Sequence, residues 1–235
     1  DTPTNYTATG SGNNAGNYAT WNPLDYSSGP TLTNGNLDAS NTGSSHIGRR
    51  ATFKFPSTGK WYYEATVTTL GGACCIGVAN SSSANPGLAQ AGTHFMLLNT
   101  SSVQKYVGGT ATTMSGFSTP SVGNVMQVAY DADAENLWIG MNNVWMGSGS
   151  SANGNPSAGS EASASNVSDI FPATSQYTSA IAANFGQRAF AYTPPTGYKS
   201  LCTTNLPDPT IADGSTYFDT TLWSGNDTQR DITGL

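Results

Sequence analysis

The chain has 235 residues, of which only 9% are charged, and its formal net charge is −6. Its eight Lys and Arg residues are scattered singly except for Arg49 and Arg50, so they cannot form a basic stripe along a phosphate backbone, and nucleic acid is excluded as an expected partner. No apolar run approaches the ~20 residues needed to cross a bilayer, so membrane insertion is not expected either.

Gly, Ser, Thr, Asn and Ala replace the missing charged residues, giving the polar, nearly uncharged composition of many extracellular and virion proteins. The sequence shows no signal peptide. It starts at Asp1 without an initiator Met, and we expect it to be processed or excised from a longer protein.

Short alternating segments separated by turn residues predict an all-β fold without long helices. In the segment 60–69, Trp61, Tyr63, Ala65 and Val67 share the face expected in the core. Asn34 and Gly35 between alternating residues predict a hairpin. The expected strands are 31–33 and 36–37 around that turn, 51–55, 60–69, 74–79, 94–99, 103–107, 125–130, 137–141, 144–146 and 177–185.

Three stretches rich in small polar residues are expected to be loops, near 41–50, 81–93 and 147–168. The last is unusually long for a compact domain, which predicts a functional or flexible segment. The Pro-containing stretch 204–212 is expected to be a stiff linker. Residues 213–235 are too few for a domain and are interpreted as the start of a following module or a packed tail.

The ordered motifs along the chain resemble those of SPRY domains, over roughly residues 17–203. The resemblance implies a two-sheet antiparallel β-sandwich of the concanavalin-like jelly-roll type, here spanning 1–203 with an N-terminal lead-in. It also implies a non-catalytic recognition role through loops at one rim. The motifs are Gly59 to Val67, Ile76 to Val78, Val128 to Asp131, Leu137 to Asn143, Asp169 to Ala173 and Ala183 to Gly186.

Further segments are similar to SPRY modules of long tailed-bacteriophage virion proteins, such as tail fibres. This similarity implies a place on the virion, at the tail or the capsid surface, and outside the cell on release. The segments are Asp1 to Tyr6, Asn17 to Asp25, Phe185 to Arg188, Phe190 to Gly197, Leu222 to Asn226 and Ile232 to Leu235.

No set of residues predicts catalysis. The chain has three Glu and two His, and no Ser or Cys lies in a nucleophile-elbow context. We therefore expect a binding protein without catalytic residues, metal or cofactor, and keep a polysaccharide-degrading enzyme as the less favoured alternative. Glu64, in the middle of a core strand, is expected to be paired or hydrogen-bonded structurally.

Asp131, Asp133 and Glu135 have the alternation of a calcium loop. An EF-hand would need Gly and Glu at the positions of Asn136 and Asn142, so a strand-to-strand turn is favoured and calcium stays an alternative. The odd number of cysteines predicts buried free thiols at Cys74, Cys75 and Cys202, with a bridge from Cys202 to one of the others as the alternative.

Five residues are the candidates for ligand binding. Trp145 follows the Asn142–Asn143 turn and precedes the long loop, where an aromatic ring can stack on a sugar or anchor a protein, although packing within the fold is the favoured role. Arg49 and Arg50 can pair with Glu64 or face a ligand, although a solvated or sheet-covering role is favoured for them. The two histidines, His46 and His94, lie in or beside the other two loops.

The expected partner is a cell-surface glycan or protein of a bacterial host, together with other virion proteins. A capsid decoration or spacer that contacts only virion proteins, and a cellular SPRY-type adaptor that binds a peptide, remain alternatives. No heptad pattern demands trimerisation, so a homo-oligomer is left open.

Overall fold

A computed structural model describes residues 16–25, 28–83, 91–206 and 217. Every regular element in these ranges is a β-strand except one short 3₁₀-helix, η1 (Thr203–Asn205), which confirms the predicted all-β class. None of the described segments forms a helix of the length and apolarity that a membrane span requires. The strands are β1 (Thr31–Thr33), β2 (Asp38–Asn41), β3 (Ile47–Arg50), β4 (Lys60–Asn80), β5 (Thr93–Asn99), β6 (Val103–Val107), β7 (Thr110–Thr113), β8 (Val125–Asp131), β9 (Asn136–Met141), β10 (Val144–Trp145), β11 (Ile170–Asn184) and β12 (Lys199–Ser200).

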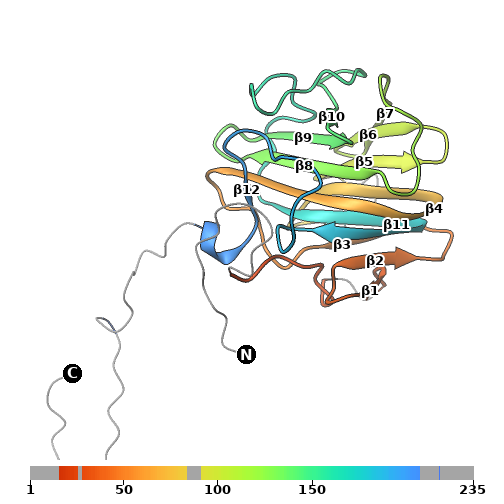
Figure 1. The fold of residues 1–235 in the computed structure, drawn as a ribbon, viewed down its shortest axis with the longest axis horizontal. Coiled ribbons are helices and arrows are strands. Elements are labelled where there is room, and N and C mark those ends of the chain that lie inside the picture. Colours follow the sequence, from red (N-terminus) through yellow and green to blue (C-terminus); the bar gives the residue numbers. More distant parts are fainter. Residues whose placement is uncertain (1–15, 26–27, 84–90, 207–216, 218–235) are drawn as a thin grey trace, which may run out of the picture.

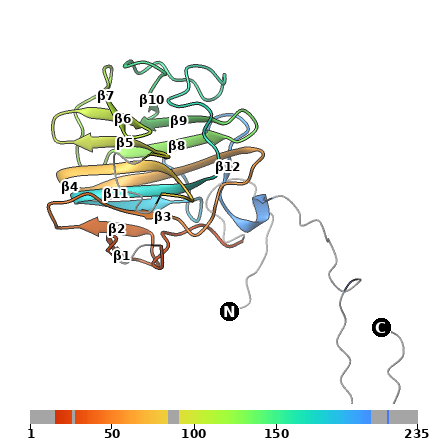
Figure 2. The same ribbon diagram turned by 180° about the vertical axis from the view of Figure 1, so that it is seen from behind.

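Two long strands, β4 and β11, run side by side through the middle of the molecule and pair along most of their length (Figures 1 and 2). The segments 60–69 and 74–79, predicted as separate strands, are the two halves of β4. Gly72 lies where the two halves join. Only glycine fits there, because a Cβ would overlap the ring of Tyr177 on β11. The register of β11 against β4 shifts between Tyr177 and Ile181, which lets both strands bend.

The bend divides the ladder into two sheets that share β4 and β11. The first half of β4 pairs with β8 and the second half with β5. One sheet thus runs β10-β9-β8-β4-β11-β2-β1, with β12 beside the start of β4, and the other runs β7-β6-β5-β4-β11-β3. Their inner faces form one core, as expected for a β-sandwich.

The aromatic core lies where sequence alternation predicts it. Trp61, Tyr63, Ala65 and Val67 are all buried on the inner face of β4. The ring of Phe185 stacks on Tyr63 with centroids 5.1 Å apart. Burial of each large side chain contributes about 2–3 kcal/mol, so this predicted stripe is a main source of the stability of the sandwich.

The predicted strand 51–55 is wrong. Ala51 forms only an isolated bridge with Trp21, and β3 ends at Arg50. Pro172 on β11 explains the stop: its carbonyl accepts from the Ala51 amide, but it has no N–H with which to continue the ladder. The nitrogen of Pro172 faces this side, away from β4, so β11 tolerates the proline and begins at Ile170 rather than at 177.

Both predicted Asn turns are confirmed. Residues 34–37 connect β1 to β2, with Asn34 and Gly35 at positive φ. The predicted strand 36–37 is wrong, because both residues belong to this turn and β2 begins at Asp38. Asn142 and Asn143, with φ of 52° and 63°, form the two-residue turn between β9 and β10. Asn tolerates the left-handed region better than most residues, which is the reason for this choice of residue.

The three cysteines are free and buried, as predicted. Of the predicted linker, the structure describes only Thr204 to Leu206, and Leu206 packs against the core. The remainder of the linker, the lead-in 1–15 and residues 213–235 apart from Tyr217 lie outside the described residues.

Candidate binding site

Trp145 packs against the outer face of the first sheet. It pairs with Gly140 across the β9–β10 hairpin, and a Cβ at Gly140 would come within 3.0 Å of the indole ring. The lack of a side chain at Gly140 therefore makes room for the ring. Tyr62, Trp138 and Tyr198 surround it in a small outer-face cluster, and Trp145 is only 8% exposed.

The indole N–H of Trp145 differs from those of the other described tryptophans. Trp21, Trp61 and Trp138 each donate to a backbone carbonyl at 2.9–3.1 Å. No described residue accepts a hydrogen bond from Trp145, and its nitrogen is not among the fully buried unpaired atoms. This donor therefore lacks a partner among the described residues, and Trp145 lines a space beside its ring.

That space is a hollow of about 330 Å³ between the β9–β10 turn, the loop that follows β10, and the segment before β12. The hydroxyl of Ser157 accepts from the amide of Thr196 at 3.3 Å and so joins the two opposite walls. No charged side chain lines the hollow. Its lining residues are Asn143, Trp145, Gly154, Asn155, Pro156, Ser157, Thr193, Pro194, Pro195 and Thr196.

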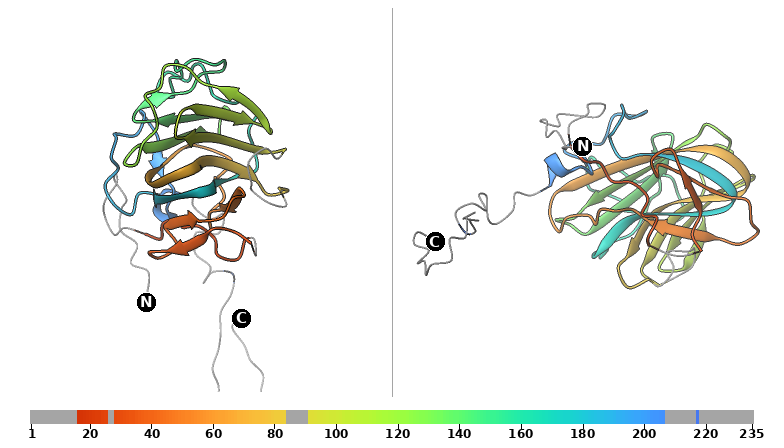
Figure 3. Two further views of the ribbon diagram at one scale, coloured as in Figure 1. Left: turned by 90° about the vertical axis from the view of Figure 1, so that its right-hand side faces the viewer. Right: turned by 90° about the horizontal axis from the view of Figure 1, so that it is seen from below.

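The long loop 147–168 lies at one edge of the sandwich, beside β9 and β10 (Figures 1 and 3). It was expected to be functional or flexible, and its backbone is hydrogen-bonded at many points along its length. Lys105 on β6, only 4% exposed, donates from its ammonium to the carbonyls of Gly147, Ser148 and Gly149 at 2.6, 2.8 and 2.9 Å. Burial lowers the pKa of this ammonium below its usual value.

Further along the loop, the hydroxyl of Ser163 donates to the Met146 carbonyl and accepts from the amide of Ile139. The indole of Trp138 holds the Ser160 carbonyl at 2.9 Å. These contacts attach the loop to β9 at several points, so the wall of the hollow is fixed before any ligand arrives.

A buried polar network supports the floor of the site. Glu64 accepts hydrogen bonds from the hydroxyl of Tyr62 and from the amides of Ala191 and Tyr192, at 2.7–3.0 Å. This confirms the predicted structural role of Glu64, with backbone amides as partners in place of Arg49 or Arg50. Gln127 links Tyr62 to the amide of Asn143, so the turn that borders the hollow is tied to β4 and β8.

The two candidate arginines lie on β3 and contact the chain segment before β1. Arg49 is 7% exposed and donates to the carbonyls of Asn22 and Pro23. Arg50 forms an ion pair with Asp25 at 2.8 Å, and its guanidinium lies over the ring of Phe171.

The two histidines are not brought together. His46 precedes β3 and lies against Tyr177 with ring centroids 5.3 Å apart. His94 is on β5, opposite Val78, with its Nδ1 buried and unpaired. His46 and His94 are separated by two strands, because β11 and β4 lie between β3 and β5. Both histidines are on the second sheet, whereas Trp145 is on the first. The five candidates therefore do not form one site.

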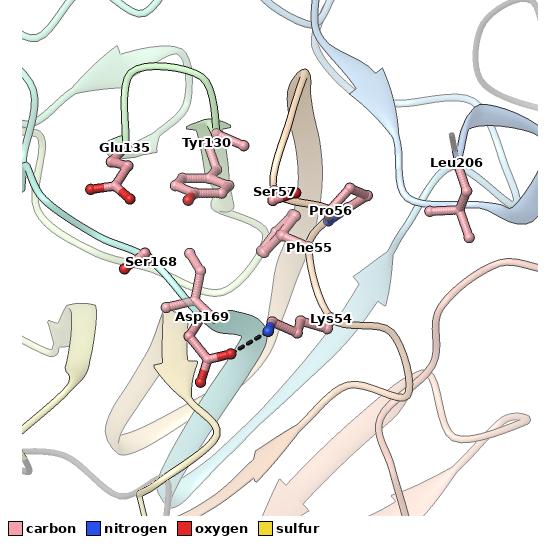
Figure 4. Close-up of a pocket in the computed structure, with 11 residues that line it drawn as sticks. Lys54, Phe55, Pro56, Ser57, Tyr130, Glu135, Ser168, Asp169 and Leu206 are labelled. Carbon is pink, nitrogen blue, oxygen red and sulfur yellow. Dashed lines mark hydrogen bonds and ion pairs between the residues drawn. The ribbon is translucent and has the colours of Figure 1, made fainter. Parts of the chain in front are cut away.

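A second hollow, of about 570 Å³, lies at the end of the sandwich near the β8–β9 turn (Figure 4). Lys54 and Asp169 form an ion pair at its edge, and Ser81 also donates to Asp169. These hydrogen bonds lower the pKa of Asp169 below its usual value, so this carboxyl stays ionised. Glu135 lies across the hollow in the same view.

The residues of the considered calcium loop form the predicted turn between β8 and β9. Asp131 pairs with Lys60 at 2.9 Å, and Asp133 accepts from the amide of Gly59. Within the described ranges, no three His, Cys, Asp or Glu side chains are placed to hold a metal ion.

Sequence reasoning found Trp145 but missed Lys105 and the wall at Thr193–Thr196. Alternation in β6 does place Lys105 on the same face as the buried Val103, which was a signal for an unusual lysine. The wall at 193–196 carried no local signal, because it reaches Trp145 only through the fold.

No protein-family model matches the sequence, and no curated protein matches it either. The fold does match solved structures. The SPRY domain of human HERC1 aligns with a TM-score of 0.51 at 13% identity, over 69% of this chain and 96% of that one. The PSpry domain of TRIM65 aligns with the same TM-score at 10% identity, over 72% of this chain and 92% of that one. The chain therefore has a SPRY-like β-sandwich fold.

Proposed function

We propose that this chain is a non-catalytic binding module of a tailed-bacteriophage virion protein, in a tail fibre or another host-contacting appendage. It binds a glycan or protein of the bacterial cell surface through loops at one rim of the sandwich. Single-site affinity would be weak and would be multiplied by the copies on the particle.

The observation that carries the binding role is the hollow beside Trp145. It is open to solvent, its walls are held by hydrogen bonds within the chain, and it lies on a loop built on a rigid sandwich. Binding residues are disproportionately placed on such loops. The virion location is supported separately, by the similarity of segments such as Asn17 to Asp25 and Phe190 to Gly197 to phage SPRY modules.

A capsid decoration or spacer is the second candidate. It would bury the loop 147–168 against a neighbouring virion protein, whereas in the isolated chain Ser148 to Ser151 are exposed.

Immunogold labelling of the parent particle with antibody against this domain tests the proposal. We expect label at the distal ends of tail appendages, and binding of the purified domain to host cells. Label spread over the capsid would support the spacer role instead, and no label on any particle would refute the virion assignment. Loss of viscosity of a host capsular polysaccharide on incubation with the domain would overturn the non-catalytic role.

A further inference from the structure

We propose that the hollow beside Trp145 is a subsite for one uncharged sugar residue, and that the indole N–H of Trp145 donates a hydrogen bond to it. The proposal rests on the binding role proposed above and adds the ligand class. It does not depend on the virion location.

The lining excludes charged ligands. Besides the indole N–H of Trp145, its polar groups are amides, hydroxyls or backbone atoms, and no lysine, arginine or carboxylate lines it. A charged ligand would lose water in such a hollow without gaining an opposite charge, and this costs more than transfer of a neutral polar group. Neutral hydroxyl groups, in contrast, find both donors and acceptors here.

The donor of Trp145 supplies a specific contact. The side chain is more than nine-tenths buried, yet its N–H has no acceptor among the described residues, whereas those of Trp21, Trp61 and Trp138 do. A sugar hydroxyl or ring oxygen can accept this bond. An aromatic ring beside neutral polar groups is the combination that suits the apolar and polar faces of a sugar.

The site is formed before binding. Pro156, Pro194 and Pro195 stiffen the walls, and the Ser157–Thr196 hydrogen bond joins them. Asn155 accepts from the amide of Ala158, which fixes its orientation at the entrance. Little conformational entropy is then lost on binding, which favours a small ligand. The volume of about 330 Å³ is at the lower end for ligand pockets, so it fits a single residue of a glycan rather than a polymer segment.

The test is a titration of the full chain, followed by the indole N–H resonances in a ¹H–¹⁵N spectrum. The probes are the methyl glycosides of glucose, galactose, mannose and N-acetylglucosamine, with glucuronic acid and glucosamine as charged counterparts. We expect at least one neutral glycoside to shift the indole resonance that is absent from Trp145→Phe, and the charged counterparts to bind at least tenfold more weakly.

Two variants separate the contact from the fold. Trp145→Phe keeps an aromatic ring and removes the N–H, and we expect about a tenfold loss of affinity, the value of roughly one hydrogen bond. Asn143→Gly keeps the turn, because glycine adopts positive φ, and removes one side-chain amide of the wall, for which we expect a smaller loss. Thermal unfolding of both variants checks that the sandwich is intact. Trp61→Phe, which removes an N–H already paired in the core, is the control and is expected to bind as the wild type does.

Equal binding of neutral and charged probes, neutral binding unchanged in both variants, or no shift of the Trp145 resonance by any probe would overturn the subsite. If the domain still bound host cells in that last case, the binding role would stand and only the ligand class would fail. If sugars bound at Trp145 but host cells and particles did not react, the subsite would stand and the virion role would fail.

Discussion

The contact of Lys105 with the loop after β10 offers the sharpest test of how the candidate site is held. Lys105→Met keeps the length of the apolar stem and removes the ammonium. The bond to the Gly147 carbonyl is buried, and this carbonyl would be left without a donor. The carbonyls of Ser148 and Gly149 are only partly buried and can turn to water.

A buried acceptor without a partner costs about 1–3 kcal/mol. Since the variant no longer buries an ammonium, part of that cost is offset, and we expect the net loss in the free energy of unfolding to be about 1–2 kcal/mol. Locally the effect is larger, because all three bonds hold the same turn of the loop. The loop amides of Gly147 and Ala152, which donate to the carbonyls of Ser151 and of Ser115 after β7, should exchange with solvent about tenfold faster.

Urea unfolding and hydrogen exchange measure the two quantities. Lys199→Met, at an exposed position on β12, is the matched control and should change stability by less than about 0.5 kcal/mol. If the loop amides of Lys105→Met kept wild-type protection, the ammonium of Lys105 would not be what holds the start of the loop 147–168 in place.

Three other outcomes are expected. Gly77→Ala would place a Cβ in the carbonyl of His94 and should lower the free energy of unfolding by about 3 kcal/mol or more in urea denaturation, whereas Gly149→Ala, with open space around it, should be close to neutral. Burial raises the pKa of the Cys74 thiol to about 12 and also raises the pKa of the Cys75 thiol, so these two buried thiols should react with Ellman's reagent only after unfolding, and their rapid reaction in the native protein would contradict this. Burial lowers the pKa values of His46 and His94 below 6.5, so their contribution to stability is complete above pH 6.5 and is lost as the pH falls through the lowered values. Urea midpoints at pH 7.5 and 5.0 should therefore differ less in the His46→Gln, His94→Gln double variant, and an unchanged difference would show that other groups cause it.

The local features of the fold could be predicted because each depends on neighbours in sequence. Alternation from Trp61 to Val67 gave the buried face, and the Asn142–Asn143 pair gave a turn that needs positive φ. The strand predicted at 51–55 is wrong because the pairing of β3 stops at Arg50. Pro172, which is far away in the sequence, causes this stop. A local pattern carries no information about such a partner.

The candidate site shows the same division. Trp145 was found from its position after a turn, but the partners of Glu64 are the amides of Ala191 and Tyr192, which no spacing rule connects to it. The sequence of the loop 147–168 shows no strand or helix periodicity. The loop is ordered instead by side chains from elsewhere in the chain, such as Lys105, which donates to its backbone carbonyls. Order maintained in this way leaves no trace in hydrophobic periodicity.

The sharing of β4 and β11 by both sheets has a consequence for synthesis of the protein. Thr174 and the carbonyl of Cys75, joined across these strands, are 99 residues apart, and folding dominated by such distant contacts is slow. Neither sheet has its central pair until β11 has left the ribosome. A nascent chain stalled before Ile170 has left the ribosome should therefore be digested by protease along its whole length. A chain stalled after Leu206 has left the ribosome should yield a protease-resistant core.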